Sequence, residues 1–157
     1  MSAWWGWIPF VLVCELVGVV GALTTDTGTS PWYRTLAKPA FQPPGWVFGP
    51  VWTLLYALMG VAAWRVWRLG PDTPGVRLAL ALFAAQLVLN AVWSPVFFGA
   101  HRIGLALVIL AALWLVLVPT TFAFFRLDRP AGGLLLPYLA WVSFAVVLNA
   151  SIWRLNG

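Results

Sequence analysis

Charge is scarce in this chain. Only 8% of its 157 residues are Asp, Glu, Lys or Arg, whereas a soluble domain carries about 25%. The mean hydropathy is +0.92, and 62% of the residues are hydrophobic. This composition argues against a water-soluble fold and favours an integral, multi-pass membrane protein, with the lipid bilayer as its main partner. The net charge is +5, but the basic residues form no run, so we expect no nucleic-acid binding.

Residues for conventional catalysis or metal binding are equally scarce. The chain has a single cysteine, Cys14, and a single histidine, His101. A single cysteine cannot form an internal disulfide or a cysteine metal cluster. The sequence offers no nucleophile–histidine–acid set and no pair of acids at helical spacing, which such catalysis requires. We therefore expect no metal site, no required cofactor and no conventional enzyme.

Long apolar runs, by contrast, are abundant. A helix that crosses a membrane needs about 20 mostly apolar residues. Five stretches qualify, and we predict helices over residues 3–23, 45–68, 76–99, 104–125 and 133–153. The first is too long and too rich in tryptophan for a cleaved signal peptide. The predicted fold class is an all-α membrane protein, a five-transmembrane-helix bundle with a long loop between helices 1 and 2, in a single domain over residues 1–157.

The loop over residues 24–44 is the longest polar gap, and it is rich in proline and aromatic residues. Pro39, Pro43 and Pro44 each fix φ and lack a backbone donor, so no regular helix can cross them. Rings lie before, between and after these prolines: Trp32, Tyr33, Phe41, Trp46, Phe48 and Trp52. A stiff loop with flat rings that leads into a membrane helix suggests a lid over a pocket.

Three of the predicted helices carry a face of rings and amides at helical spacing. The members of these faces are Gly49, Trp52, Tyr56 and Met59; Gln86, Asn90, Trp93 and Phe97; and Trp141, Ala145 and Leu148, with Asn149 at the edge. One interpretation is that amides and rings join the helices to one another, at about 0.6 kcal/mol for each bond. The other is that the three faces and the aromatic loop enclose a pocket.

Glu15 falls near the middle of the first predicted helix. An acid inside the membrane is costly and is a candidate functional group by default. The alternative is a protonated carboxyl group that bonds to a neighbouring helix.

Three blocks of sequence resemble the TspO/MBR family, the translocator proteins or peripheral-type benzodiazepine receptors, in a bacterial-type member. The first runs from Trp32 to Gly60 and has the pattern WY-x-x-L-x-KP-x-F-x-PP-x-WVF-x-x-x-W-x-x-LY-x-x-MG. The second, QLVLNAVWSPVFFG, runs from Gln86 to Gly99. The third, PYLAWVSFAVVLNASIWRLN, runs from Pro137 to Asn156. Together the three blocks and the spans around them extend the resemblance over the whole chain.

The resemblance implies a five-helix bundle, usually a homodimer, with a ligand pocket under the first loop. Ligands of the family are porphyrins and haem, sterols such as cholesterol, and aromatic drug-like molecules. The pocket positions that the resemblance implies are Tyr33, Trp52, Asn90, Phe97, Trp141 and Ala145. Animal members place a tyrosine in the sterol motif of the last helix, where this chain has Ala150, Ser151 and Ile152. Sterol recognition by that motif is therefore not expected.

These observations support three hypotheses. The first is a membrane receptor or carrier for porphyrin-type tetrapyrroles, in which Trp52 and Trp141 stack on the macrocycle and Arg34 and Lys38 bind its propionates. The second is a light-dependent porphyrin-degrading enzyme that uses Trp52 and Trp141. The third is a structural or regulatory membrane component. The full set of predicted ligand-binding residues is Tyr33, Arg34, Lys38, Phe41, Trp52, Tyr56, Gln86, Asn90, Trp93, Phe97, Trp141 and Ala145.

Overall fold

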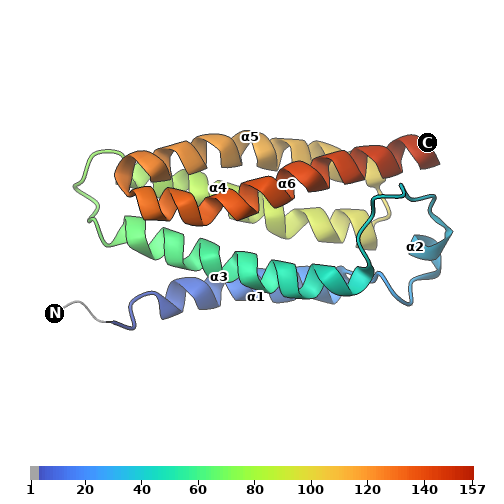
Figure 1. Ribbon diagram of the computed structural model, residues 1–157, viewed down its shortest axis with the longest axis horizontal. Coiled ribbons are helices and arrows are strands. Elements are labelled where there is room, and N and C mark those ends of the chain that lie inside the picture. The colour runs from blue at the N-terminus through green and yellow to red at the C-terminus, as the bar shows by residue number, and fades with distance from the viewer. Residues whose placement is uncertain (1–3) are drawn as a thin grey trace.

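The computed structural model describes residues 4–157, and every regular element among them is helical. In chain order the elements are α1 (Ile8–Thr24), α2 (Pro31–Thr35), a 3₁₀ turn η1 (Gly45–Val47), α3 (Phe48–Trp67), α4 (Val76–Ser94), a π-helical turn η2 (Pro95–Gly99), α5 (Ile103–Leu127) and α6 (Arg129–Asn156). The long helices run side by side along the long axis of the molecule, and α2 lies at the same end as the C-terminus (Figure 1).

The helices pack as a bundle with α3 and α4 in central positions. Helix α1 contacts α3 and α4, α5 contacts α4 and α6, and α6 also contacts α3. Side chains that these contacts bury include Met59, Leu117 and Tyr138, each with no exposed surface. Large apolar side chains also cover the outside, as Leu16 and Val88 show with 63% and 62% of their surface exposed. An apolar exterior suits hydrocarbon as the surrounding solvent.

The prediction of an all-helical membrane protein is confirmed, with a correction to the first helix. Four helical segments are long and apolar enough to cross a membrane: Gly45–Trp67, Val76–Gly99, Ile103–Leu127 and Arg129–Asn156. Helix α1 has 17 residues and begins at Ile8, later than the predicted start at residue 3, which lies outside the described residues. Pro9 explains the late start, because proline lacks a backbone N–H and is favoured in the first turn of a helix.

The last helix begins earlier than its sequence pattern predicts. Only Asp128 separates α5 from α6, and α6 starts at Arg129 with Pro130 in its first turn. The pattern over residues 126–130 looks like a polar gap because its one proline and its charges are common in loops, but proline also suits a helix start. Arg65 on α3 holds this corner: its Nε lies 2.8 Å from Asp128 Oδ2 and its Nη2 donates to Oδ1 at 3.2 Å.

The loop after α1 contains a short helix that the prolines and aromatics of this segment did not reveal. Ser30 caps α2, because its Oγ accepts a hydrogen bond from the Tyr33 N–H at 3.3 Å, and Pro31 follows at the first helical position. A serine cap followed directly by proline is a recognised start signal for a helix. We call residues 25–44 the lid, because they cover one end of the bundle (Figure 1).

Helices α1 and α3 approach each other closely at one point. A Cβ atom on Gly60 would lie 2.5 Å from the Cα of Val11 and 2.6 Å from its nitrogen. Only glycine allows this backbone contact, which is the packing expected of small residues between membrane helices. Gly49, a little over ten residues earlier on α3, differs, since a Cβ there would meet nothing within 4 Å.

We predict that Gly60→Ala destabilises the bundle, whereas Gly49→Ala does not. The added methyl group at position 60 must push the α1 backbone away, at a cost of about 1–3 kcal/mol. Thermal unfolding in detergent, followed by circular dichroism, should show a lower midpoint for Gly60→Ala only. Equal midpoints for the two variants would contradict the close contact.

Candidate functional site

Asn156 at the end of α6 holds the lid on the bundle. Its Oδ1 accepts a hydrogen bond from the Ala37 N–H at 2.9 Å, and its Nδ2 donates to the Ala37 carbonyl oxygen at 2.9 Å. Lys38 orders the same segment, because its Nζ donates to the Tyr33 carbonyl oxygen at 2.6 Å and to that of Leu36 at 3.2 Å. The ammonium group also lies 4.4 Å from the centre of the Tyr33 ring. The lid is thus ordered by its own polar groups and by contacts with α6, which include the Asn156 amide and the Phe144 ring.

The first turn of the lid is organised by Asp26. Its Oδ1 accepts hydrogen bonds from the N–H groups of Gly28 and Thr29, and its Oδ2 accepts one from the Thr29 hydroxyl. These bonds, chiefly that from the Thr29 hydroxyl, lower the pKa of Asp26 to about 2. The stabilisation that these bonds give to the turn is fully present at pH values above the ordinary aspartate pKa. It is lost only as the pH falls through about 2, where the Asp26 carboxylate becomes protonated. Arg34 closes the turn by donating from Nε to the Gly28 carbonyl oxygen at 2.8 Å.

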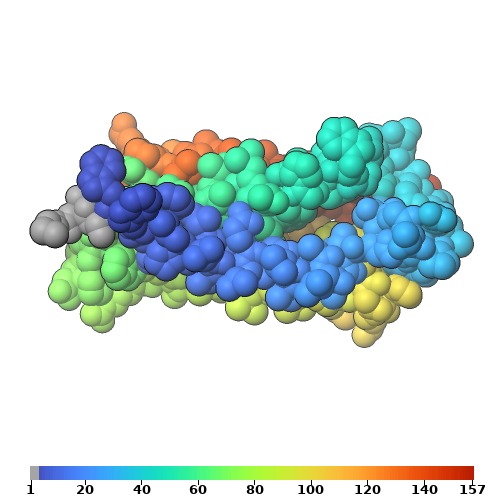
Figure 2. All heavy atoms as spheres, turned by 90° about the horizontal axis from the view of Figure 1, so that it is seen from below, coloured from blue at the N-terminus to red at the C-terminus, as the bar shows by residue number. Residues whose placement is uncertain are grey.

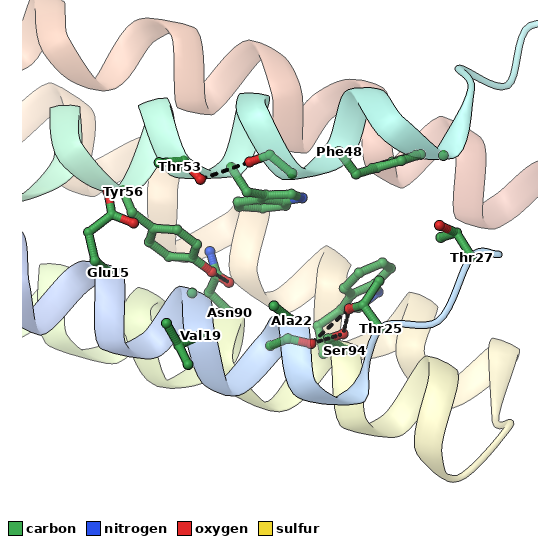
Figure 3. Close-up of a pocket in the computed structure, with 16 residues that line it drawn as sticks. Glu15, Val19, Ala22, Thr25, Thr27, Phe48, Thr53, Tyr56, Asn90 and Ser94 are labelled. Carbon is green, nitrogen blue, oxygen red and sulfur yellow. Dashed lines mark hydrogen bonds between the residues drawn. The ribbon is translucent and has the colours of Figure 1, made fainter. Parts of the chain in front are cut away.

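A cavity of about 350 Å³ lies between α1, α3 and α4 beneath the lid. Its size is within the range of small-molecule sites, which hold ligands in about 300–1,000 Å³. The surface of the molecule is hollowed between α1 and α3 at the lid end (Figure 2). The close-up places Glu15 and Tyr56 at one end of the cavity and Thr27 and Phe48 at the other (Figure 3).

A second cavity of about 80 Å³ lies among the lid, α3, η2 and α6. Both cavities are lined by Thr25, Thr27, Phe48, Trp52 and Trp93. Trp52 is therefore a wall between two spaces, one that opens between α1 and α3 and one enclosed by aromatic side chains. The arrangement can hold a flat apolar molecule against an indole face.

The rings of Trp52 and Trp141 touch each other. Their centroids lie 6.4 Å apart, and their planes are inclined at 88°. In this arrangement a planar guest cannot lie between the two faces unless one side chain rotates. Trp52 is presented to both cavities, while Trp141 lines only the smaller one.

A chain of buried hydrogen bonds forms the floor beneath Trp52. The Tyr56 hydroxyl donates to Asn90 Oδ1 at 2.7 Å, Asn90 Nδ2 donates to the Tyr138 hydroxyl at 2.7 Å, and that hydroxyl donates to Gln86 Oε1 at 2.7 Å. Gln86 Nε2 is 3.9 Å from the Met59 sulfur. The chain joins α3, α4 and α6. Gln86 has no exposed surface and serves packing, whereas Asn90 both joins helices and lines the larger cavity.

Hydroxyl groups form the opposite wall, where α1 meets α4. Ser94 Oγ lies 2.5 Å from Thr25 Oγ1 and donates to the Gly21 carbonyl oxygen at 3.2 Å. Thr24 Oγ1 donates to the same carbonyl at 2.9 Å and to Ser94 Oγ at 3.3 Å. This cluster places polar groups near the lid end of an otherwise apolar cavity.

Eight of the twelve predicted ligand-binding residues line one of the two cavities. Trp52, Tyr56, Asn90 and Trp93 line the larger cavity, and the smaller one is lined by Tyr33, Trp52, Trp93, Phe97, Trp141 and Ala145. Four lie elsewhere. Arg34 and Lys38 bond to lid carbonyl oxygens, Gln86 is buried in the floor, and Phe41 packs on the Phe144 ring at 6.2 Å.

The contribution of α1 is the part of the site that the three ring-and-amide faces did not reveal. Glu15, Gly18, Ala22 and Thr25 all line the larger cavity. They are spaced at i, i+3, i+7 and i+10, the pattern of one helix face. This spacing is present in the sequence, but the face carries small residues instead of rings, so it does not stand out as a pocket wall.

We predict that Asn156→Ala loosens the lid. The variant loses both bonds to Ala37, each giving about 0.5–1.5 kcal/mol, so the Ala37 amide should exchange its hydrogen roughly tenfold faster. Hydrogen–deuterium exchange with mass spectrometry measures this. Leu155→Ala is the matched control, because the Leu155 side chain is 54% exposed and makes no bond to the lid. Unchanged exchange in Asn156→Ala would mean that other contacts hold the lid.

Comparison with known proteins agrees with this architecture. The TspO/MBR family model matches residues 10–154. A tryptophan-rich protein TspO of Chlorobaculum tepidum is 44% identical over 92% of this chain and 91% of its own length. A tryptophan-rich sensory protein of Cereibacter sphaeroides is 43% identical over 98% and 92%. The translocator protein of Homo sapiens is 41% identical over 96% and 91%.

The family match covers the five long helices and the lid, including the residues around both cavities. Four of these helices are also long and apolar enough to cross a bilayer. The chain therefore belongs to the TspO/MBR family and is an integral, multi-pass membrane protein.

Proposed function

We propose that this protein is a membrane receptor or carrier that binds a flat tetrapyrrole, such as a porphyrin, in the cavity beneath the lid. The observation that carries the proposal is the position of Trp52, whose indole forms a wall of both cavities. An aromatic contact adds about 0.5–1.5 kcal/mol beyond the burial of apolar area. The names of two relatives, a sensory protein and a translocator protein, agree with a role in recognition or passage of a ligand.

All five long helices cross the bilayer in this proposal. Helix α1 has 17 residues, which span about 25 Å at 1.5 Å for each residue. This is a few ångströms less than a typical hydrocarbon core, a difference that a bilayer accommodates by local thinning. Trp4 and Trp5 precede α1 with 84% and 72% of their surface exposed, and tryptophan is enriched at the membrane interface.

The charges of the lid suit the carboxylate edge of a tetrapyrrole. Arg34 uses its Nε for the Gly28 carbonyl oxygen, which leaves its terminal nitrogens for an anionic partner. Lys38 is already bonded to two lid carbonyl oxygens, so its part is to add positive charge near the rim. Bonds between cationic donors and carboxylates are stronger than neutral hydrogen bonds. The apolar macrocycle would then lie against Trp52, with its propionates towards the lid.

Binding is tested by titrating the protein in nanodiscs with protoporphyrin and following tryptophan fluorescence. We expect Trp52→Ala to weaken binding about tenfold, the factor that 1.4 kcal/mol gives. Trp67→Ala is the control, because Trp67 lies at the opposite end of α3 and is 57% exposed. Unchanged emission at saturating protoporphyrin would overturn the proposal. A fall in thermal stability without a loss of affinity in Trp52→Ala would favour a structural or regulatory role instead.

Light-dependent breakdown of the porphyrin is a second candidate, favoured by the contact between Trp52 and Trp141. Light excites the bound macrocycle, which takes an electron from the neighbouring indole and passes it to dioxygen. The indole radical then recovers an electron from the macrocycle, so the net change is oxidation of the porphyrin and reduction of dioxygen. Because the ligand absorbs the energy, no acid–base set is required.

We predict that the double variant Trp52→Phe, Trp141→Phe slows bleaching of the bound porphyrin under illumination in air. Phenylalanine keeps an aromatic ring but is far harder to oxidise than indole. The decay of the Soret band measures the rate, and samples without oxygen serve as the control. Equal decay in the double variant and the parent protein would remove the enzymatic candidate.

A further inference from the structure

Glu15 is the one acidic or basic side chain that lies away from the ends of the five long helices described by the structure. The remaining Asp, Glu, Lys and Arg residues of these helices lie in a first or last turn: Arg65, Arg77, Arg126, Arg129 and Arg154. An acid at this depth is costly, and function is the default explanation for its presence. The pocket positions that the family resemblance implies do not include Glu15.

The Glu15 side chain extends from α1 towards α3 and lies beside Tyr56 (Figure 3). It is half-buried and lines the larger cavity. Among residues 4–157 no hydrogen bond or ion pair to its carboxyl group is present. The alternative of a carboxyl group bonded to a neighbouring helix is therefore not what the structure has.

The cavity is a wedge, and Glu15 lies near its narrow end. One turn before Glu15, the α1 backbone at Val11 is in contact with Gly60 of α3. On the lid side of Glu15 the Tyr56 ring still touches α1, because a Cβ on Gly18 would lie 2.7 Å from that ring. Beyond this contact the cavity widens: a Cβ on Gly49 would meet nothing within 4 Å, and one on Gly21 would come no closer than 4.0 Å to Ser94 of α4. A ligand that fills the cavity from the lid end therefore brings its leading end to the Tyr56 ring and the Glu15 carboxyl group beside it.

Hydrogen-bond acceptors are in excess at this end of the cavity. The Tyr56 hydroxyl proton is used by Asn90, and an amide proton of Asn90 is used by Tyr138. Both carboxyl oxygens of Glu15 and a lone pair of the Tyr56 oxygen remain as acceptors. Among the described residues that line this cavity, none is a lysine or arginine that could neutralise the carboxyl group. A matching ligand supplies the missing donor.

We propose that Glu15 is a recognition site at the narrow end of the cavity for the N–H or ammonium group of a ligand whose flat apolar body lies against Trp52. The inference rests on the proposed binding function and adds a chemical requirement to it. The same carboxyl group disfavours an anionic edge at this end, so the carboxylates of a tetrapyrrole are directed towards the lid.

Two matched probes test the site: 9-(methylaminomethyl)anthracene, which carries an N–H donor, and 9-(methoxymethyl)anthracene, which does not. Anthracene accepts excitation energy from tryptophan, so its sensitised emission reports binding to the protein in nonionic micelles. For the parent protein we expect the amine to bind at least about tenfold more tightly than the ether, as a bond to a charged group allows. Glu15→Gln should bring this ratio close to one while the ether affinity stays within about twofold.

Two further variants act as controls. Leu16→Gln adds an amide to the neighbouring residue, whose side chain is 63% exposed, and should keep the parent ratio. Glu15→Asp withdraws the carboxyl group by one methylene and should reduce the ratio part of the way, which gives a second readout if Glu15→Gln does not fold.

An unchanged ratio in Glu15→Gln would overturn the inference, and so would an equal loss of both probes, since that result means the side chain only supports the cavity. The test is separate from that of porphyrin binding. If protoporphyrin fails to bind the parent protein while the amine preference is present and depends on Glu15, the recognition site stands and the tetrapyrrole proposal falls.

Discussion

The hydrogen-bond chain from Tyr56 through Asn90 and Tyr138 to Gln86 is the constraint on which the rest of the site depends. In hydrocarbon a polar side chain finds no water, so each of these groups must be satisfied by another helix. The chain does this with three bonds of 2.7 Å that join α3, α4 and α6. By fixing the relative rotation of these helices, it sets the height of the floor and the direction in which Trp52 faces.

Along the interface of α1 with α3, glycine has two opposite effects. Gly60 removes a side chain so that the α3 backbone can touch Val11, while Gly49 removes one where nothing takes its place. The first glycine closes the bundle and the second opens it. The larger cavity lies on the lid side of the Gly60 contact, and Gly49 is one of the residues that line it.

Much of the architecture could be predicted because its signals are local. The lengths of the apolar runs predicted the helices. The spacing of rings and amides on the second, third and fifth predicted helices predicted a pocket wall, and Trp52, Asn90 and Trp141 do line the cavities. The short helix after Ser30 and the early start of α6 at Arg129 were missed, because proline marks both a loop and the first turn of a helix. The hydrogen-bond partners of individual side chains could not be predicted. The bond from Lys38 Nζ to the Tyr33 carbonyl oxygen is an example, because it depends on the path that the lid follows in the folded protein.

The ion pair between Arg65 and Asp128 ties the last turn of α3 to the corner between α5 and α6 with two bonds of 2.8 and 3.2 Å. At the other end, the lid is held to the bundle by the Asn156 amide and by ring contacts, such as that of Tyr33 with Phe98 and that of Phe41 with Phe144. The two ends of the molecule are therefore held by different forces. Added salt weakens an ion pair and leaves apolar ring contacts in place, so ionic strength acts on one end of the bundle more than on the other.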